Sequence, residues 1–490
     1  MLLNNLSMLF PTLDFGIFFL FVFFGSWCLK KYPLWDRLFL IAASYFFYGY
    51  WDWHFVFLLF GCTLFNYLLA LLIQRADQAG ARAESHTTGA RLLLAFSVVV
   101  NLGVLAFFKY YYFLTINLNN VFLFFGIPFK LPLFFVTLPV GISFFTFQAM
   151  SYTIDVYRHK LQAQRSLINI LLYISFFPQL VAGPIVRATD FLPQLNRNPS
   201  LKEINFGRAF TLISFGLIKK VFIANYLGIM LVDPVFNNPS AYSGLELLAG
   251  LYGYAVQIFC DFSAYSDIAI GVALLFGFDF PPNFKNPYCA LSIQDFWRRW
   301  HISLSTWLKD YLYIPLGGNR HGRLASYRNL FLTMLLGGLW HGADWKFVIW
   351  GGLHGLGLSA ERLVRELRPL HVISNKDRPL WLKVLRFIFT FHFVGLGWIF
   401  FRAPSLELAW EYLCGIFSQG GSLQIFNPFL LSLILIGLVI HFIPENWQSG
   451  LEKILGRLPV PILATAFGLL LILLSAVSTS EVAPFIYFQF

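Results

Sequence analysis

The chain has 490 residues, of which 58% are hydrophobic and 12% are charged, and its mean hydropathy is +0.66. Soluble globular chains are about 45–50% apolar, so this composition excludes an ordinary soluble enzyme and predicts an integral membrane protein. The formal net charge of +11 comes without any nucleic-acid recognition motif. We therefore expect no nucleic-acid partner and assign the basic excess to cytoplasmic loops.

Apolar runs of roughly membrane-spanning length, about 20 helical residues, recur along the whole chain. They cover residues 10–27, 55–73, 92–108, 134–149, 210–229, 247–276, 429–442 and 462–477. The pattern predicts an all-α polytopic membrane protein with roughly 11 to 13 transmembrane or re-entrant helices. No hydrophilic stretch is long enough for a second soluble domain, so we expect one membrane domain over residues 1–490.

The start of the chain predicts its orientation. The first thirteen residues carry no charged side chain, whereas Lys30 and Lys31 follow the first apolar run. This order is the reverse of the basic start of a signal peptide. We therefore expect no cleaved signal and an N-terminus outside the cytoplasm.

Polar side chains interrupt the apolar run at residues 257–271, QIFCDFSAYSDIAIG. On a helix, Asp261 lies one turn before Tyr265, and Ser263 lies one turn before Asp267. These groups cannot all face lipid without a large cost in free energy. At least one face of the helix must therefore contact a water-filled cavity or a polar partner, and the two aspartates are either hydrogen-bond anchors or part of a site.

The following segment, residues 280–320, alternates aromatic and charged side chains. Pro281, Pro282 and Pro287 interrupt helix formation, and Ser292 is suited to cap a new helix. Tryptophan and tyrosine rings beside cations are typical of the membrane interface. Arg298 and Arg299 either satisfy the excess of positive charge on the cytoplasmic side or bind the phosphates of an acyl donor.

His341 is the candidate base, because it stands in the string GGLWHGADW (337–345) within an otherwise apolar run. Ionisable residues inside a membrane are functional candidates by default. The structural alternative is a buried, hydrogen-bonded imidazole at a junction of closely packed helices, which the spacing of Gly338 and Gly342 favours. We also expect the glycines to leave room beside the ring for a substrate. His301 is the second candidate.

A histidine with a pKa near neutrality can take a proton from an alcohol and return it to a leaving group. A metal is not expected, because His301 and His341 are 40 residues apart (341 − 301) and no H-E-x-x-H motif accompanies them. The five cysteines form no C-x-x-C pair. A serine triad is not expected either, because the G-x-S-x-G motif is absent.

The chain resembles the membrane-bound O-acyltransferase family, in particular its bacterial alginate O-acetyltransferase branch. The resemblance is carried by residues 296–320, FWRRWHISLSTWLKDYLYIPLGGNR, and 328–355, RNLFLTMLLGGLWHGADWKFVIWGGLHG. Further agreement is found at residues 65–73, 138–158, 176–187, 260–271, 283–288 (NFKNPY) and 484–490 (PFIYFQF). It implies a ring of helices around a central funnel, in the inner membrane of a bacterium with the N-terminus in the periplasm, and a catalytic core block at residues 256–355.

The resemblance also implies roles for particular residues. His341 matches the proposed catalytic histidine of the family, and His301 matches a second position needed for activity. Residues expected to line or shape the site and funnel are Asp261, Tyr265, Asp267, Asn286, Arg298, Arg299, Trp300, Asp310 and Trp340. No bound cofactor is implied.

The expected reaction moves an acyl group, acetyl in this branch, from a cytoplasmic acetyl-CoA or acyl-carrier thioester to a polysaccharide hydroxyl, directly or through a periplasmic or membrane partner protein. Peptidoglycan, cellulose or teichoic acid are alternative acceptors to an alginate-type exopolysaccharide. A different class of function, a polysaccharide or lipid transporter or a scaffold of an envelope-modifying complex, remains as the rival. A transporter should show two symmetric halves, and no internal repeat is evident.

Overall fold

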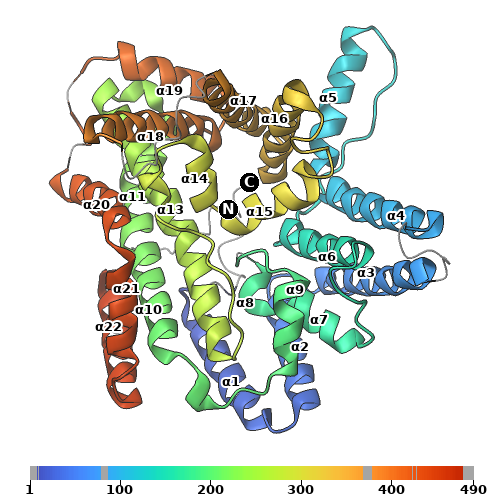
Figure 1. Ribbon diagram of the computed structural model, residues 1–490. Coiled ribbons are helices and arrows are strands. Elements are labelled where there is room, and N and C mark those ends of the chain that lie inside the picture. Colours follow the sequence, from blue (N-terminus) through green and yellow to red (C-terminus); the bar gives the residue numbers. More distant parts are fainter. Residues whose placement is uncertain are drawn as a thin grey trace. The chain divides into compact units, whose positions relative to one another are not determined.

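The protein is described from a computed structural model, which covers residue 8 and residues 10–78, 86–181, 183–367, 378–421, 423–425 and 427–477. Over these residues the regular structure is helical throughout, without a strand (Figure 1). The prediction of an all-α polytopic membrane protein is confirmed. The motif at 484–490 lies outside the described residues.

The chain divides into two compact units. Unit 1 contains Met1–Phe206 and Ala269–Pro281, and unit 2 contains Gly207–Ile268 and Pro282–Phe490. The prediction of one domain over residues 1–490, and of helices in a ring around a funnel, stays a prediction.

The helices of unit 1 begin and end as follows: α1 Leu13–Leu29, α2 Pro33–Gly49, α3 His54–Gln78, α4 Thr88–Leu105, α5 Tyr111–Phe124, α6 Ile142–Tyr157, α7 Leu167–Ser175, α8 Phe177–Leu180 and α9 Ala188–Phe191, with π-helix η1 Ala106–Tyr110 and 3₁₀-helices η2 Leu192–Asn196 and η3 Leu201–Glu203. Helix α13, Gly244–Leu275, contributes its last residues to unit 1 and the rest to unit 2.

The other helices, assigned to unit 2 apart from the first residue of α10, are α10 Phe206–Leu217, α11 Asn225–Leu227, α12 Asp233–Asn237, α14 Ile293–Arg299, α15 Ile302–Leu308, α16 Gly322–His341, α17 Trp345–Leu367, α18 Leu380–Arg402, α19 Leu406–Ser418, α20 Pro428–Val439, α21 Glu445–Leu455 and α22 Val460–Val477. Short π-helices are η4 Ile218–Ala224, η5 Gly228–Val232 and η8 Lys309–Tyr313, and short 3₁₀-helices are η6 Pro239–Ala241, η7 Pro287–Cys289 and η9 Ile440–Phe442.

Six described helical segments are long and apolar enough to cross a membrane, or seven if the bent pair Pro428–Phe442 and Asn446–Leu455 is one span. The six are His54–Gln78, Thr88–Phe124, Phe206–Asn237, Gly244–Leu275, Leu380–Arg402 and Val460–Val477. Five of them coincide with the apolar runs at 55–73, 92–108, 210–229, 247–276 and 462–477. The run at 10–27 matches the shorter apolar helix α1.

The run at 134–149 differs from the expected helix, because α6 begins only at Ile142. Pro139 and Gly141 precede that start, and Gly141 takes the left-handed conformation with φ +73°. A Cβ on Gly141 would lie 2.6 Å from the carbonyl oxygen of Leu180, so only glycine fits this turn. From Ile142 to Val156 every residue is buried, so α6 is a core helix of unit 1.

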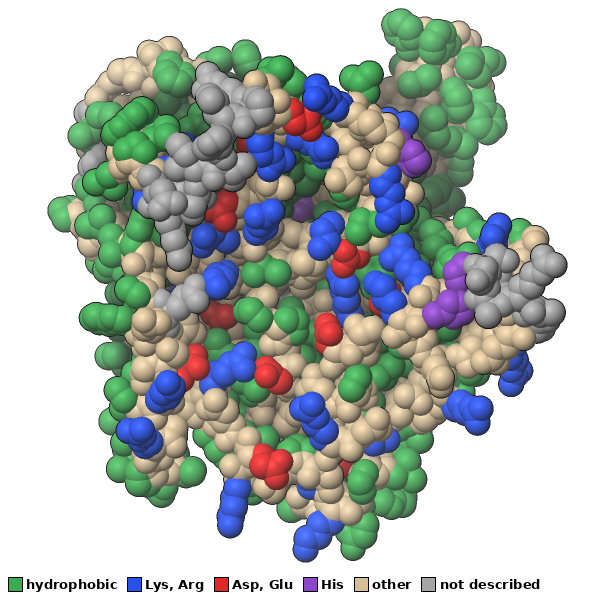
Figure 2. Space-filling model, in the orientation of Figure 1, with side chains coloured by type: hydrophobic (Ala, Val, Ile, Leu, Met, Phe, Trp, Pro, Cys, Tyr) green, Lys and Arg blue, Asp and Glu red, His purple; other side chains and the backbone are tan. Residues whose placement is uncertain are grey.

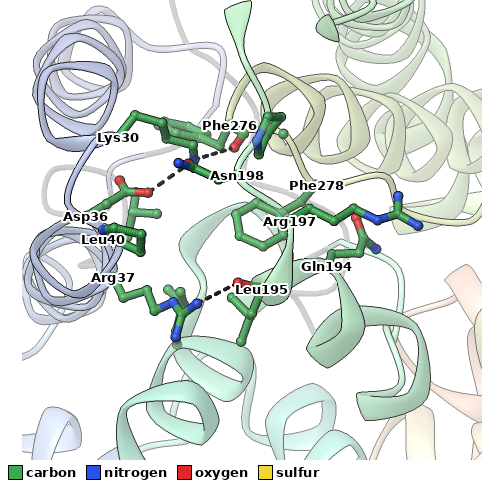
Figure 3. A pocket seen from close by; sticks show the side chains of 14 residues that line it. Lys30, Asp36, Arg37, Leu40, Gln194, Leu195, Arg197, Asn198, Phe276 and Phe278 are labelled. Atoms are coloured by element: carbon green, nitrogen blue, oxygen red, sulfur yellow. Dashed lines mark hydrogen bonds and ion pairs between the residues drawn. The ribbon is translucent and has the colours of Figure 1, made fainter.

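A cavity of about 30 Å³ in unit 1 shows how basic side chains hold chain segments together (Figure 3). Lys30 Nζ donates to Asp36 Oδ2 at 3.1 Å and to the carbonyl of Phe276 at 3.2 Å. Arg37 donates to Asn169 Oδ1 at 2.9 Å and to the carbonyl of Leu195 at 2.5 Å. These two cations therefore bind acceptors of the protein itself. Lys30 ties the α1–α2 turn to the residue after α13, and Arg37 ties α2 to α7 and η2.

Candidate active site

Two closely packed helices position the candidate base His341. Helices α16 and α17 run side by side (Figure 1), and a Cβ on Gly338 would collide with the carbonyl oxygen of Phe347 and lie 2.9 Å from Gly351 Cα. A Cβ on Gly351 would lie 2.5 Å from the carbonyl oxygen of Met334. The predicted close helix approach through glycines is confirmed. His341 is the last residue of α16.

The expectation that glycines leave room beside the His341 ring is wrong for Gly338 and Gly342. The backbone of α17 occupies the space beside Gly338, and a Cβ on Gly342 would collide with the ring of Phe347. Both glycines therefore serve close packing, because each lies against a neighbour that a side chain would displace.

The His341 imidazole is buried in an aromatic cluster. Its ring centroid lies 5.0 Å from those of Trp340 and Trp350 and 5.2 Å from that of Phe401, with each pair in an edge-to-face arrangement. Such contacts hold a ring in one orientation. His341 is 4% exposed, so the protein fixes the position of this ionisable group.

His301 lies between α14 and α15 in a left-handed backbone conformation, with φ +44°. This conformation costs free energy in a residue other than glycine and persists only when surrounding contacts enforce it. His301 Nδ1 lies 3.2 Å from Asn283 Oδ1. The same oxygen accepts from the Ser303 backbone N–H at 3.1 Å and from Ser303 Oγ at 2.8 Å, while Asn283 Nδ2 donates to Ser266 Oγ at 3.0 Å.

These hydrogen bonds define the tautomer of His301. Asn283 Oδ1 is an acceptor, so the imidazole proton is assigned to Nδ1 and the lone pair to Nε2. Full burial lowers the pKa of His301 from 6.5 to about 3. The ring is therefore neutral at physiological pH and takes part in hydrogen bonding without carrying a charge.

Trp340 connects the two histidines. Its ring centroid lies 6.1 Å from that of His301 and 5.0 Å from that of His341. Trp300 belongs to the same aromatic region, with its ring 5.0 Å from Trp398 and 5.1 Å from Phe284. The structure thus brings together four of the residues predicted for the site, all of them buried.

The predicted polar residues of α13 pair with lysines of π-helix η4. Asp261 forms an ion pair with Lys220 at 2.7 Å, and Asp267 forms one with Lys219 at 2.5 Å. Lys220 Nζ also lies 5.6 Å from the centroid of the Tyr265 ring. The polar face of α13 thus has a polar partner, which was one of the two arrangements that its sequence allowed.

The remaining predicted residues lie around α14 and η8. Asn286 adopts φ +46° before η7. Arg299 pairs with Asp295 at 2.9 Å and donates to the carbonyl of Lys285 at 3.5 Å. Asp310 lies 3.5 Å from Lys309, and the Arg298 side chain is exposed. Lys and Arg side chains gather over α14 and α15 on the face shown in Figure 2.

Sequence reasoning missed two features of this site. It included Asn283 only in the stretch 283–288 that agrees with the family, although this residue holds His301, and neither its residue type nor its spacing indicates that contact. It also overlooked Lys219 and Lys220, which stand adjacent inside the apolar run 210–229. Two charges at membrane depth require partners, so that pair was a usable signal.

The fold is that of a polytopic membrane protein with a buried histidine site, and comparison with known proteins gives its family. The chain belongs to the membrane-bound O-acyltransferase family, whose model matches residues 43–401. The chain is therefore an O-acyltransferase. The family supports this enzyme and not the alternative functions of transporter or scaffold.

Three relatives describe the range of similarity. The chain is 38% identical to the probable alginate O-acetylase of Azotobacter vinelandii, over 99% of this chain and 100% of that protein. It is 38% identical to the peptidoglycan O-acetyltransferase of Helicobacter pylori, over 86% of this chain and 82% of that protein. It is 30% identical to the teichoic acid D-alanyltransferase of Streptococcus thermophilus, over 54% of this chain and 68% of that protein.

Proposed function

We propose that this enzyme transfers an acetyl group from a cytoplasmic thioester, acetyl-CoA or an acyl-carrier thioester, to a hydroxyl of a polysaccharide outside the cytoplasmic membrane. The observation that carries the proposal is the pair of buried histidines, His301 and His341, that contact one indole in a chain of this family. Similarity along nearly the whole chain to a protein named for alginate supports an exopolysaccharide acceptor. Peptidoglycan, cellulose and teichoic acid are the alternatives.

His341 acts as the general base. It takes the proton of the acceptor hydroxyl while the hydroxyl oxygen attacks the thioester carbonyl carbon. A carbon–oxygen bond forms, the carbon–sulfur bond breaks, and the proton passes to the departing thiolate. Because His341 ends α16, the partial negative charge at the C-terminus of this helix favours the imidazolium that forms during transfer. A histidine that carries the acetyl group transiently is the alternative role.

His301 supports His341 as a neutral hydrogen-bonding group, since its ring stays uncharged at the pH of the reaction. Asn283 fixes its orientation. Trp340, whose ring lies against both imidazoles, keeps water away from them, and a site that excludes water strengthens the electrostatic interactions within it. The final polymer receives the group either directly or through a periplasmic or membrane partner protein.

The test is the acetyl content of extracellular and wall polysaccharides in a strain that lacks this chain. The strain is complemented with wild type, His341→Ala or His54→Gln, matched for abundance in the membrane. His54 is an exposed histidine at the start of α3 and serves as the control. We expect wild type and His54→Gln to restore acetyl esters and His341→Ala to restore none. Full restoration by His341→Ala would contradict the proposed mechanism.

A further inference from the structure

Unit 1 contains a cluster of Asp77, His86 and His159, none of which belongs to the candidate active site. Asp77 Oδ2 lies 2.9 Å from His86 Nδ1 and 3.1 Å from His159 Nε2, and the three atoms all lie within 4.8 Å of one another. The residues stand 9 (86 − 77) and 73 (159 − 86) positions apart, so no sequence motif indicates the cluster. Figure 2 shows histidine side chains at the surface near α4 and α6.

The three ligand atoms lie close enough together to bind one metal ion. Adjacent ligands around a tetrahedral zinc ion with bonds of about 2.0–2.1 Å are about 3.3 Å apart, close to the two distances measured here. Both imidazole nitrogens point at the same carboxylate oxygen. Two imidazoles with one carboxylate suit Zn²⁺ and its transition-metal neighbours, whereas Mg²⁺ and Ca²⁺ prefer sites made only of oxygen.

The surroundings hold the three ligands in place. The backbone N–H of Thr87 donates to Asp77 Oδ1 at 3.1 Å, which leaves Oδ2 to face both histidines. The His86 ring stacks on Tyr157 at 3.9 Å and on His159 at 5.0 Å. His159 adopts φ +56° two residues after the end of α6. Residues that do not themselves bind a metal ion support its site in two ways: they hydrogen-bond to the ligands, and they fix the orientation of the ligand rings.

We propose that Asp77, His86 and His159 bind one divalent transition-metal ion of the Zn²⁺ class. The three ligands come from the last turn of α3, the residue before the N-cap of α4 and the residues after α6. His159 is 68% exposed, so the remaining coordination positions face solvent. The ion links three helix ends on one side of unit 1, and its binding free energy adds to the stability of their arrangement. This inference is independent of the proposed function.

The test measures metal binding by the full-length chain in detergent, purified with a tag that lacks histidine and stripped with a chelator. Zinc sulfate is added, excess ion is removed by gel filtration, and bound zinc is counted by mass spectrometry. We expect one zinc ion per wild-type chain and a higher melting temperature with zinc. Affinity should fall at least about tenfold in Asp77→Asn, His86→Gln and His159→Gln, since even residues outside the ligand set cost about 10–100-fold when lost.

His54→Gln is the matched control, because His54 Nδ1 lies 2.8 Å from Asp52 in an exposed pair with a single imidazole. It should bind zinc like wild type. His159→Gln alters an exposed side chain, so its elution volume and zinc-free melting temperature should match those of wild type. If wild type binds no zinc, or if His159→Gln binds it with unchanged affinity, the cluster is a hydrogen-bonded group of two imidazoles and a carboxylate and the proposal is wrong.

Discussion

At the scale of single residues, the orientation of His301 depends on Asn283. The asparagine oxygen accepts from the imidazole and from both donors of Ser303. This arrangement enforces a left-handed backbone at His301 and places its ring against that of Trp340. The strained backbone of His301 is therefore explained, because the buried hydrogen bonds around Asn283 compensate for its unfavourable φ.

Because His301 is buried, we predict that the free energy of unfolding of the protein decreases as the pH falls. Its pKa is about 3 in the folded protein and about 6.5 in an unfolded chain. Because the folded pKa is the lower one, the unfolded state binds the proton first. The contribution of the neutral His301 ring to the free energy of unfolding is complete above about pH 6.5. Below that pH it decreases by about 1.4 kcal/mol per pH unit as the pH falls towards 3.

The measurement compares thermal unfolding of wild type and His301→Gln in detergent between pH 7.5 and pH 5. We expect the melting temperature of wild type to fall more steeply with acid than that of the variant. The comparison uses slopes, because the substitution also changes stability at neutral pH. Equal slopes would show that His301 is not the group whose protonation opposes folding.

At the scale of elements, η4 and α13 are joined by two ion pairs of different burial. Lys220 and Asp261 are almost completely buried, whereas the side chains of Lys219 and Asp267 are 12% and 26% exposed. Loss of one partner of a buried pair costs about 3–5 kcal/mol, because the other charge remains in a medium of low dielectric constant. We predict that Lys220→Met lowers the melting temperature strongly and that Lys219→Met lowers it less.

The double variant Lys220→Met/Asp261→Leu separates charge from packing. Replacement of a buried ion pair by apolar side chains of similar volume is often neutral, so we expect the double variant to recover most of the stability lost by Lys220→Met. Thermal unfolding in detergent measures all three variants. A double variant that is less stable than Lys220→Met would mean that Asp261 has a structural role beyond this pair.

The contact of α16 and α17 depends on glycine at one position and tolerates a side chain at another. A Cβ on Gly338 would collide with the backbone of α17, whereas a Cβ on Gly352 would have its nearest neighbour, Leu335 Cδ1, at 3.8 Å. We predict that Gly338→Ala costs about 1–3 kcal/mol or more through overpacking, and that Gly352→Ala does not lower stability and raises it by up to about 1 kcal/mol, because alanine favours a helix interior more than glycine does.

We expect Gly338→Ala to lower acetyl transfer more than Gly352→Ala does, because α16 ends at His341 and α17 carries Trp350 beside it. The two variants are compared by melting temperature in detergent and by acetyl content of complemented cells. Equal effects of the two alanine substitutions would contradict close helix approach at Gly338.

The sequence predicted those elements whose signals are local. Ser292 caps α14, accepting from the Asp295 N–H at 3.1 Å, and the prolines before it leave residues 276–286 outside helices. The polar face at 257–271 required a partner and has one. The partners of particular atoms could not be predicted, because Asn283 and His301 are 18 positions apart in the sequence, and His86 and His159 are 73 positions apart. Such contacts depend on the packing of helices, which hydrophobic periodicity does not determine.

At the scale of the whole molecule, the spans differ in how far they face lipid. Most of α13 is buried within the protein, whereas the apolar window of α22 is only 11% buried. A helix that is apolar on all sides and little buried must contact lipid acyl chains. The composition of 58% hydrophobic residues therefore reflects lipid contact as well as a core, and Lys220 and Asp261, two charged residues within spans, form a buried ion pair.

The distribution of charge predicts the orientation of the chain. Three basic residues lie around the α1–α2 turn: Lys30 and Lys31 follow α1, and Arg37 stands near the start of α2. The segment between α5 and α6 contains one basic residue, Lys130, and no acidic one. Lysine and arginine in short loops remain on the cytoplasmic side. We predict that Lys31 lies in the cytoplasm and that Ile127, after the span Thr88–Phe124, lies outside it.

Single cysteines test this orientation. Lys31→Cys and Ile127→Cys are placed in a background in which the five native cysteines are replaced by serine, and intact cells with a permeabilised outer membrane are treated with a membrane-impermeant maleimide. Both positions are exposed, so accessibility reports the side of the membrane. We expect labelling of Ile127→Cys in intact cells and of Lys31→Cys only after lysis. The reverse pattern would place the N-terminus in the cytoplasm and would require the thioester donor to approach the His301 and His341 site from the opposite side.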